Sequence, residues 1–176
     1  MPVTIRRAAA SDAPGLARVA AITFPLACPP TTTEEAKAQF IATVLSEEAF
    51  AGYLASERHD VLLAELDGEV VGYTLLITGD PADPDVAQAV RARPTVELSK
   101  VYVLPEHHGQ GVSAALMDAS VSAARETGAA SMWLGVNNLN ARANRFYEKQ
   151  GFAVVGRKKF RLGDVDEDDF VRELVL

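Results

Sequence analysis

The chain has 176 residues, of which 48% are hydrophobic and 23% charged, and its formal net charge is −7. This length suffices for one sizeable core but is short for two independent domains, so we expect a single domain over residues 1–176. The negative charge argues against sequence-blind nucleic-acid binding, which depends on many Lys and Arg side chains. It favours a cationic small molecule as a ligand.

The numbers and positions of cysteine, histidine and apolar residues argue against a membrane, secreted, disulfide-bonded or metal-binding protein. No stretch approaches the roughly 18 uninterrupted apolar residues of a membrane span, and charged residues interrupt the N-terminal segment where a signal peptide would lie. We therefore predict a cytoplasmic protein with no membrane partner. Cys28 is the only cysteine, so an internal disulfide is impossible. Of the three histidines, His107 and His108 are adjacent, and such neighbours rarely bind one ion, so we predict no metal.

The first half of the chain predicts a strand, helical stretches and a hairpin. Asp67-Gly68 separates two apolar, β-branched runs and suits the positive φ angles of a tight turn. Ser11 and Asp12 are predicted to cap the first helix. In chain order we expect a strand at residues 3–9, a helix to about Ala21, a helical stretch from Thr33 to about Leu54, a hairpin over 60–78 and an extended loop at 79–85.

In the second half, strands and helices alternate before a closing hairpin. We expect a strand at residues 96–104, a helix from Gly109 to about Glu126, a strand at 131–136, a helix at 140–150, and a hairpin formed by 152–162 and 169–176. Alternation in the middle with antiparallel hairpins around it predicts an α/β class, a mixed sheet with helices on both faces.

The segment LPEHHGQGVSAALM, residues 104–117, carries Gly109 and Gly111 between a strand and an apolar helix. This order leaves the unpaired N–H groups and the positive dipole end of the helix at the turn, where an anion such as phosphate can bind. No Lys follows the glycines as in a P-loop, and their spacing is not that of the dinucleotide fingerprint. Two glycines before a helix can also simply end one element and begin the next without binding a ligand, so this turn alone leaves phosphate binding open.

A second segment, VNNLNARANRFYEKQGF at 136–152, follows at the distance of one more strand and helix. Together with VYVLPEHHGQGVSAALM it resembles the two core motifs of the GNAT superfamily of N-acetyltransferases, which move an acetyl group from acetyl-CoA to an amine. The resemblance covers roughly residues 96–156, and the order of the N-terminal elements agrees more loosely. It implies the GNAT acyl-CoA N-acyltransferase fold, a mixed and mostly antiparallel sheet of about six or seven strands, with acetyl-CoA as co-substrate.

The resemblance also implies the cofactor-binding residues. The pyrophosphate loop of the family falls on His108, Gly109, Gln110, Gly111, Val112 and Ser113. His108 stands where the family has Arg or Gln, and Ser113 where it has Gly or Ala; His108 can still hydrogen-bond, and Ser113 is small and adds a hydroxyl donor. The strand end, Val101, Tyr102 and Val103, would pair its backbone with the pantetheine arm. Asn140 would contact the cofactor, cap the following helix, or do both.

Amine acetylation needs a neutral nitrogen, a stabilised oxyanion and a leaving thiolate that is protonated or hydrogen-bonded. The resemblance implies Glu97 as the base, often through water, and Tyr147 as the acid facing the CoA sulfur. It implies that the N–H of Val103 stabilises the oxyanion. A salt bridge from Glu97 to Lys100 and core packing of Tyr147 beside Phe146 are the alternatives.

The acceptor is the least predictable part. We expect residues 78–95 and the helical stretch from Phe40 to Leu54 to build its pocket, with a small-molecule primary amine as acceptor. ELSKVYVLPEHHGQG and the ending FRLGDVDEDDFVRELVL look similar to the bacterial spermidine/spermine acetyltransferase branch. The acidic run at 164–169 would attract a polyamine or form a solvated hairpin tip. A protein or peptide N-acetyltransferase and a non-catalytic acyl-CoA-binding domain stay open as alternatives, as does a homodimer.

Overall fold

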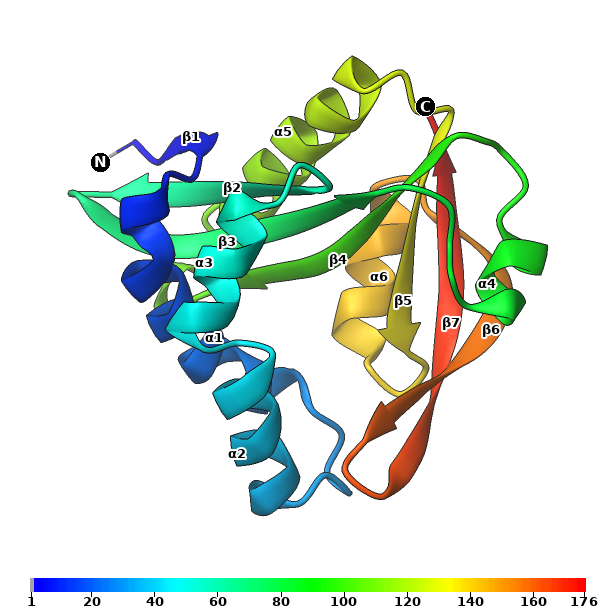
Figure 1. Cartoon of the computed structure of the whole chain (residues 1–176), viewed down its shortest axis with the longest axis horizontal. Helices are drawn as coiled ribbons and strands as arrows, with labels where there is room; N and C mark the ends of the chain where they lie inside the picture. The colour runs from blue at the N-terminus through cyan, green and yellow to red at the C-terminus, as the bar shows by residue number, and fades with distance from the viewer. Residues whose placement is uncertain (1) are drawn as a thin grey trace.

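The computed structural model, shown in Figure 1, describes residues 2–176. Its seven strands form one sheet in the order β1-β2-β3-β4-β5-β7-β6, and every neighbouring pair is antiparallel except β4 and β5. The predicted mixed, mostly antiparallel sheet is confirmed. The strands are β1 (Thr4–Arg7), β2 (His59–Leu66), β3 (Glu69–Thr78), β4 (Thr95–Val103), β5 (Ser131–Asn137), β6 (Ala153–Leu162) and β7 (Val165–Val175).

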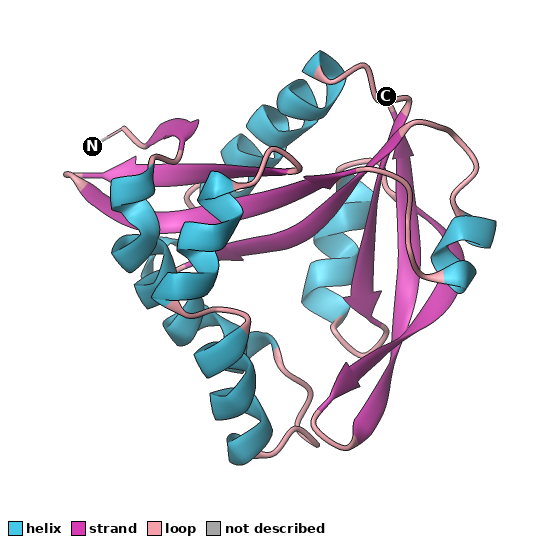
Figure 2. Cartoon of the chain, in the orientation of Figure 1, coloured by secondary structure: helices cyan, strands magenta, loops and turns pink. Residues whose placement is uncertain are grey.

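Helices cover both faces of the sheet, as Figures 1 and 2 show. Helices α1 and α3 pack on one face, over β2, β3 and β4, and α5 packs on the other, against β1 to β5. The short α4 lies against β6. The helices are α1 (Ala13–Ala27), α2 (Glu34–Thr43), α3 (Glu47–Ala55), α4 (Pro84–Ala89), α5 (Val112–Glu126) and α6 (Ala141–Lys149).

Two predicted helix boundaries in the first third are wrong. Helix α1 continues from the predicted end near Ala21 to Ala27, with Pro25 inside it. Pro25 removes only one helical hydrogen bond, and the ring of buried Phe24 stacks on Phe40 of α2 at 4.5 Å, so packing outweighs that loss. The predicted stretch from Thr33 to Leu54 is two helices, because the Ser46 hydroxyl accepts a hydrogen bond from the N–H of Ala49 and starts α3.

The loop predicted at 79–85 ends in a helix instead. The Asp83 carboxylate accepts hydrogen bonds from the N–H groups of Asp85 and Val86, and Pro84 occupies the first helical position of α4. The hairpin around Asp67 and Gly68 is confirmed, with φ of 52° and 81°.

The acidic run lies in a strand rather than on a hairpin tip, since β7 begins at Val165 and only Asp164 of the run precedes it. Basic residues of β6 face these carboxylates across the pair of strands and hold them in the sheet. The cross-strand ion pairs are Lys158–Asp169, Lys159–Asp168 and Arg161–Asp166.

Two irregularities of β4 shape the site. Leu98 lies opposite Leu76 and Lys100 opposite Leu75, so Ser99 is an extra residue, a β-bulge that brings Lys100 onto the same face as Glu97. Strand β4 pairs with β5 only from Thr95 to Glu97, and beyond this point the two strands separate.

Candidate active site

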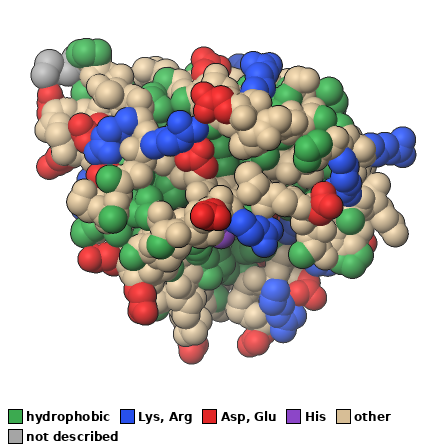
Figure 3. Space-filling model, turned by 45° about the horizontal axis from the view of Figure 1, so that its top comes forward, with side chains coloured by type: hydrophobic (Ala, Val, Ile, Leu, Met, Phe, Trp, Pro, Cys, Tyr) green, Lys and Arg blue, Asp and Glu red, His purple; other side chains and the backbone are tan. Residues whose placement is uncertain are grey.

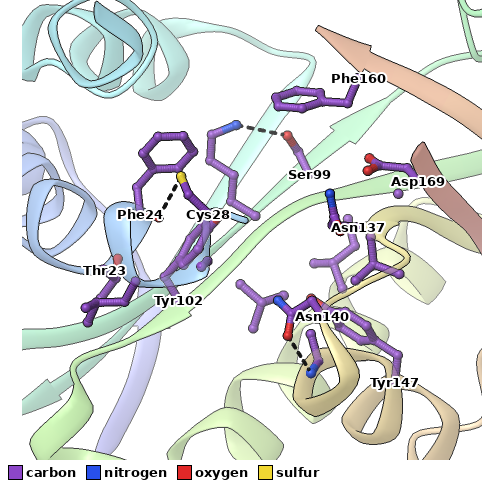
Figure 4. A pocket seen from close by; sticks show the side chains of 18 of the residues that line it. Thr23, Phe24, Cys28, Ser99, Tyr102, Asn137, Asn140, Tyr147, Phe160 and Asp169 are labelled. Carbon is purple, nitrogen blue, oxygen red and sulfur yellow. Dashed lines mark hydrogen bonds between the residues drawn. The ribbon is translucent and has the colours of Figure 1, made fainter. Parts of the chain in front are cut away.

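A pocket of about 450 Å³ lies where β4 and β5 separate. Side chains from α1, α2, α6, β6 and β7 complete its walls, and Figure 4 labels ten of the residues that line the pocket, among them Ser99 and Tyr102 of β4. Of the residues predicted for the site, eight line this pocket: Glu97, Val101, Tyr102, Val103, His108, Ser113, Asn140 and Tyr147. Gly109, Gln110, Gly111 and Val112 do not line it, although they join His108 to Ser113.

The backbone of β4 presents free edge groups to the pocket. The N–H of Leu104 donates to the carbonyl of Val71 at 2.9 Å, so Leu104 and Tyr102 are hydrogen-bonded toward β3. In an antiparallel pair, residues that hydrogen-bond to the neighbouring strand alternate with residues that do not. The N–H groups of Val101 and Val103 therefore point away from β3, to the side from which β5 has separated. An extended, peptide-like ligand can pair with this edge as an added strand would.

The glycine turn opens directly onto the first turn of α5. Gly109 and Gly111 have φ of 77° and 80°, and no heavy atom lies within 4 Å of a Cβ added at either position. The helix predicted from Gly109 therefore starts at Val112, because left-handed backbone cannot continue a right-handed helix. The first N–H groups of α5 have no intrahelical partner, and the open space at both glycines leaves room for a phosphate.

His108 and Ser113, the two departures from the family pattern, make different contacts. The ring of His108 lies 2.8 Å, through Nε2, from the carbonyl oxygen of Val103 and so ties the turn to the end of β4. Ser113 lies in the first turn of α5 and lines the pocket. The capping role considered for Asn140 is confirmed, since its Oδ1 accepts a hydrogen bond from Ala143 N–H at 3.1 Å. Its side chain also lines the pocket, and the cofactor contact stays a prediction.

Tyr147 combines core packing with access to the pocket. Its ring lies 5.5 Å from that of Phe146 and 6.0 Å from that of Phe152, and burial raises its pKa to about 12. A second phenol, that of Tyr102, lines the same pocket, and burial raises its pKa as well. Sequence reasoning assigned Tyr102 a backbone role only.

Glu97 is half-buried and lines the pocket from β4. Burial raises the pKa of its carboxyl, while Lys100 and Lys158 partly offset that rise. The alternative salt bridge to Lys100 is not formed: within the described part of the chain, no carboxylate oxygen lies within 4.0 Å of the Lys100 ammonium. A carboxyl with a raised pKa is a stronger proton acceptor than an ordinary carboxylate.

A second carboxyl in the pocket, Asp169 on β7, was missed as a site residue. It is 8% exposed, and burial raises its pKa to about 6, with its Lys158 partner 3.8 Å away. Both side chains cross Gly135 of β5, where an added Cβ would come within 3.1 Å of Lys158 and 3.2 Å of Asp169. A glycine inside an otherwise apolar strand was the available signal.

An aromatic wall faces the charged groups. Phe24 stacks on Phe40 at 4.5 Å, and Phe160 meets Phe40 edge-on at 6.0 Å. The Cys28 thiol donates to the Phe24 carbonyl, and burial raises its pKa, which makes it a poor nucleophile.

A family model described as the acetyltransferase (GNAT) family matches residues 27–152. The chain belongs to this family. An uncharacterised N-acetyltransferase of Mycobacterium bovis is 48% identical over 167 residues, which cover 94% of this chain and 99% of that protein. The PaiA N-acetyltransferase of Thermoplasma acidophilum, solved in complex with coenzyme A, superposes with a TM-score of 0.79 at 21% identity, and all of both chains is covered. The ribosomal-protein-S18-alanine N-acetyltransferase of Escherichia coli gives a TM-score of 0.69 at 22% identity, covering 99% of this chain and 94% of that one.

The acetyltransferase fold is thus confirmed, and the protein is an N-acetyltransferase. Residues 78–95, predicted from the sequence to build the acceptor site, do not line this pocket. Val86 and Val90 of this insert are buried against Trp133 and Val171 instead, whereas Phe40 of the predicted helical stretch does line the pocket. The segment Thr23–Pro29 supplies the remaining wall and was not predicted.

Two properties of the described residues bear on ligands of other kinds. Over residues 2–176, no group of three or more His, Cys, Asp or Glu side chains is placed to hold a metal ion. None of the helices in that range combines the length and the apolar character that crossing a bilayer requires.

Proposed function

We propose that this acetyltransferase, acting as one domain in the cytoplasm, moves the acetyl group of acetyl-CoA to a primary amine of a small molecule. The observation that carries the proposal is one pocket in which a free strand edge, a carboxyl and a phenol come together, with both ends of a glycine turn, His108 and Ser113, in its lining at a helix N-terminus. The residues fit acetyl-CoA. Val101 and Val103 offer the edge for the pantetheine arm, and the turn from His108 to Ser113 offers N–H groups and space for the pyrophosphate.

In the proposed reaction the amine nitrogen attacks the acetyl carbonyl carbon, the carbon–sulfur bond breaks with its electron pair going to sulfur, and coenzyme A leaves as a thiolate that takes its proton from solvent. Glu97 takes the proton of the incoming amine, directly or through water, and its raised pKa suits that task near neutral pH. The N–H of Val103 donates to the carbonyl oxygen as charge develops there. Tyr147 donates a hydrogen bond to the departing sulfur.

The polyamine branch receives limited support from the acidic run. Asp166, Asp168 and Asp169 are engaged by basic residues of β6. Acidic and basic side chains are interspersed on the face seen in Figure 3, with no region of one sign. A polyamine therefore stays one candidate acceptor among small amines.

The test is release of free thiol from acetyl-CoA with a panel of small amines, polyamines and peptides, together with the thermal midpoint of the protein with and without coenzyme A. We expect coenzyme A to raise the midpoint and at least one small amine to be acetylated. Turnover with peptides only would favour a protein N-acetyltransferase. A raised midpoint without turnover on any amine would favour the non-catalytic acyl-CoA-binding domain.

A further inference from the structure

The side chain of Lys100 lines the pocket without an ion-pair partner among residues 2–176. The bulge at Ser99 turns it onto the face that carries Glu97, and it is half-buried. Its ammonium makes one hydrogen bond, to the Ser99 hydroxyl at 3.3 Å. Withdrawing an ammonium from water without a partner is costly, and burial correspondingly lowers the pKa of Lys100. An anionic group of a ligand would offset that cost.

Most of the other charged side chains around the pocket are already engaged. Asp169 pairs with Lys158, and Glu167 accepts hydrogen bonds from Asn137 and Thr31. Within the described residues, the Glu97 carboxylate and the Arg142 guanidinium make no hydrogen bond or ion pair, but Arg142 is exposed on α6, whereas Glu97 is half-buried. Lys100 and Glu97 thus leave one half-buried positive and one half-buried negative charge for a ligand, on the same strand and the same face.

We assign Lys100 to the acceptor half of the pocket. Its hydrogen-bond partner Ser99 is labelled in Figure 4 and lies toward Phe160 in that view, away from Tyr147 and Asn140. A group held there would sit opposite the cofactor residues. A polyamine, in contrast, would bring a further cation toward Lys100 and Lys158, which is unfavourable at short range.

We propose that the acceptor carries a carboxylate that pairs with Lys100, in addition to the amine that is acetylated. This inference rests on the proposed function and names its substrate class, an amino-acid-like zwitterion. The aromatic wall of Phe24, Phe40 and Phe160 adds a preference for an apolar body. The carboxylate can come from a free amino acid or from the C-terminus of a short peptide.

The experiment compares each acid with its own amide: phenylalanine with phenylalaninamide, and glycyl-phenylalanine with its amide, with spermidine alongside. We expect kcat/KM for the acid to exceed that for its amide by about 10- to 100-fold, the range of a charge-assisted hydrogen bond. The amide has the more acidic ammonium and is more often neutral, so amine basicity cannot produce this preference. The better of the two acids identifies the source of the carboxylate.

In Lys100→Met the ratio of acid to amide should fall to about one, and in Lys149→Met, the same change on the exposed surface of α6, it should stay at the wild-type value. A wild-type ratio near or below one, better turnover with spermidine, or an unchanged ratio in Lys100→Met would overturn the proposal. The wild-type comparison decides the matter even if the variant does not fold.

Binding separates this proposal from the proposed function. Calorimetric titration of acid and amide into the protein saturated with coenzyme A needs no turnover. If no amine is acetylated, the proposed function fails, while tighter binding of the acid that is lost in Lys100→Met still supports the carboxylate site. If neither acid binds better than its amide, the carboxylate site is refuted, whatever the outcome for catalysis.

Discussion

Replacing Tyr147 with Phe tests whether its hydroxyl meets the leaving sulfur. Burial raises the pKa of Tyr147 to about 12, whereas an ordinary thiol has a pKa near 8.5. Complete proton transfer from the phenol to the thiolate is then uphill by about 3.5 units, or roughly 5 kcal/mol at 1.36 kcal/mol per unit. The structure therefore favours a hydrogen bond over full acid catalysis. A hydrogen bond to a charged group contributes about 1.5–3 kcal/mol, so kcat should fall roughly 10- to 150-fold.

The assay is thiol release at saturating acetyl-CoA and amine, with acetyl-CoA affinity and thermal midpoint measured on the same preparation. Both should stay near wild type, because the hydroxyl of Tyr147 has no hydrogen-bond partner among the described residues and the ring packing is retained. Tyr102→Phe removes the other phenol of the pocket and serves as the matched variant. Wild-type kcat in Tyr147→Phe would refute the reasoning, and a loss confined to Tyr102→Phe would move the role to that residue.

Three further changes test other parts of the site. Gly111→Asp should lose most of the thermal shift produced by coenzyme A, because it adds a carboxylate where we place the pyrophosphate. Gly111→Asn has a side chain of similar size and tolerance of positive φ but no charge, and it should keep more of the shift. Equal shifts in the two variants would mean that the phosphate lies elsewhere. Glu97→Gln should lower kcat/KM most near neutral pH and least at high pH, where the amine loses its proton unaided, and a deficit constant with pH would argue against a base. Asp169→Asn should stabilise the protein above pH 6 by up to about 3 kcal/mol. The pKa of Asp169 is about 6, raised from 3.8, so ionising this carboxyl lowers the stability of the wild type as pH rises from about 4 through 6. Melting curves of variant and wild type that differ equally at pH 4 and pH 8 would contradict this.

The segments that we assign to the cofactor could be located in the sequence because they are short and continuous, and the structure brings their ends to one pocket. The glycine turn and the motif around Tyr147 each occupy neighbouring residues, and their spacing reports one strand and one helix. The capping role of Asn140 could be predicted, because a helix cap depends only on residues three positions apart. Features that depend on residues close together in the chain, such as turns and helix caps, can be predicted from a single sequence.

The acceptor half could not be predicted, because it is assembled from residues far apart in the chain. The stacking of Phe24 on Phe40 keeps α1 helical past Pro25, and no local rule predicts that continuation. Residues 78–95 contain loop-like signals, but the apolar side chains of Val86 and Val90 find a partner in Trp133. Tertiary packing decides both cases, and it is not visible in local propensity.

The extra residue in β4 would allow one strand to serve both of the proposed substrates. Without the bulge at Ser99, strict alternation would place Val101 on the face of Glu97 and turn Lys100 toward α5. With it, Val101 lies opposite Thr74, whose hydroxyl bonds Ser120 of α5, and Lys100 lines the pocket on the face of Glu97. The backbone edge can therefore hold one substrate in the plane of the sheet while side chains contact the other above it. The separation of β5 frees that edge at the same place, so the bulge and the separation together create the site.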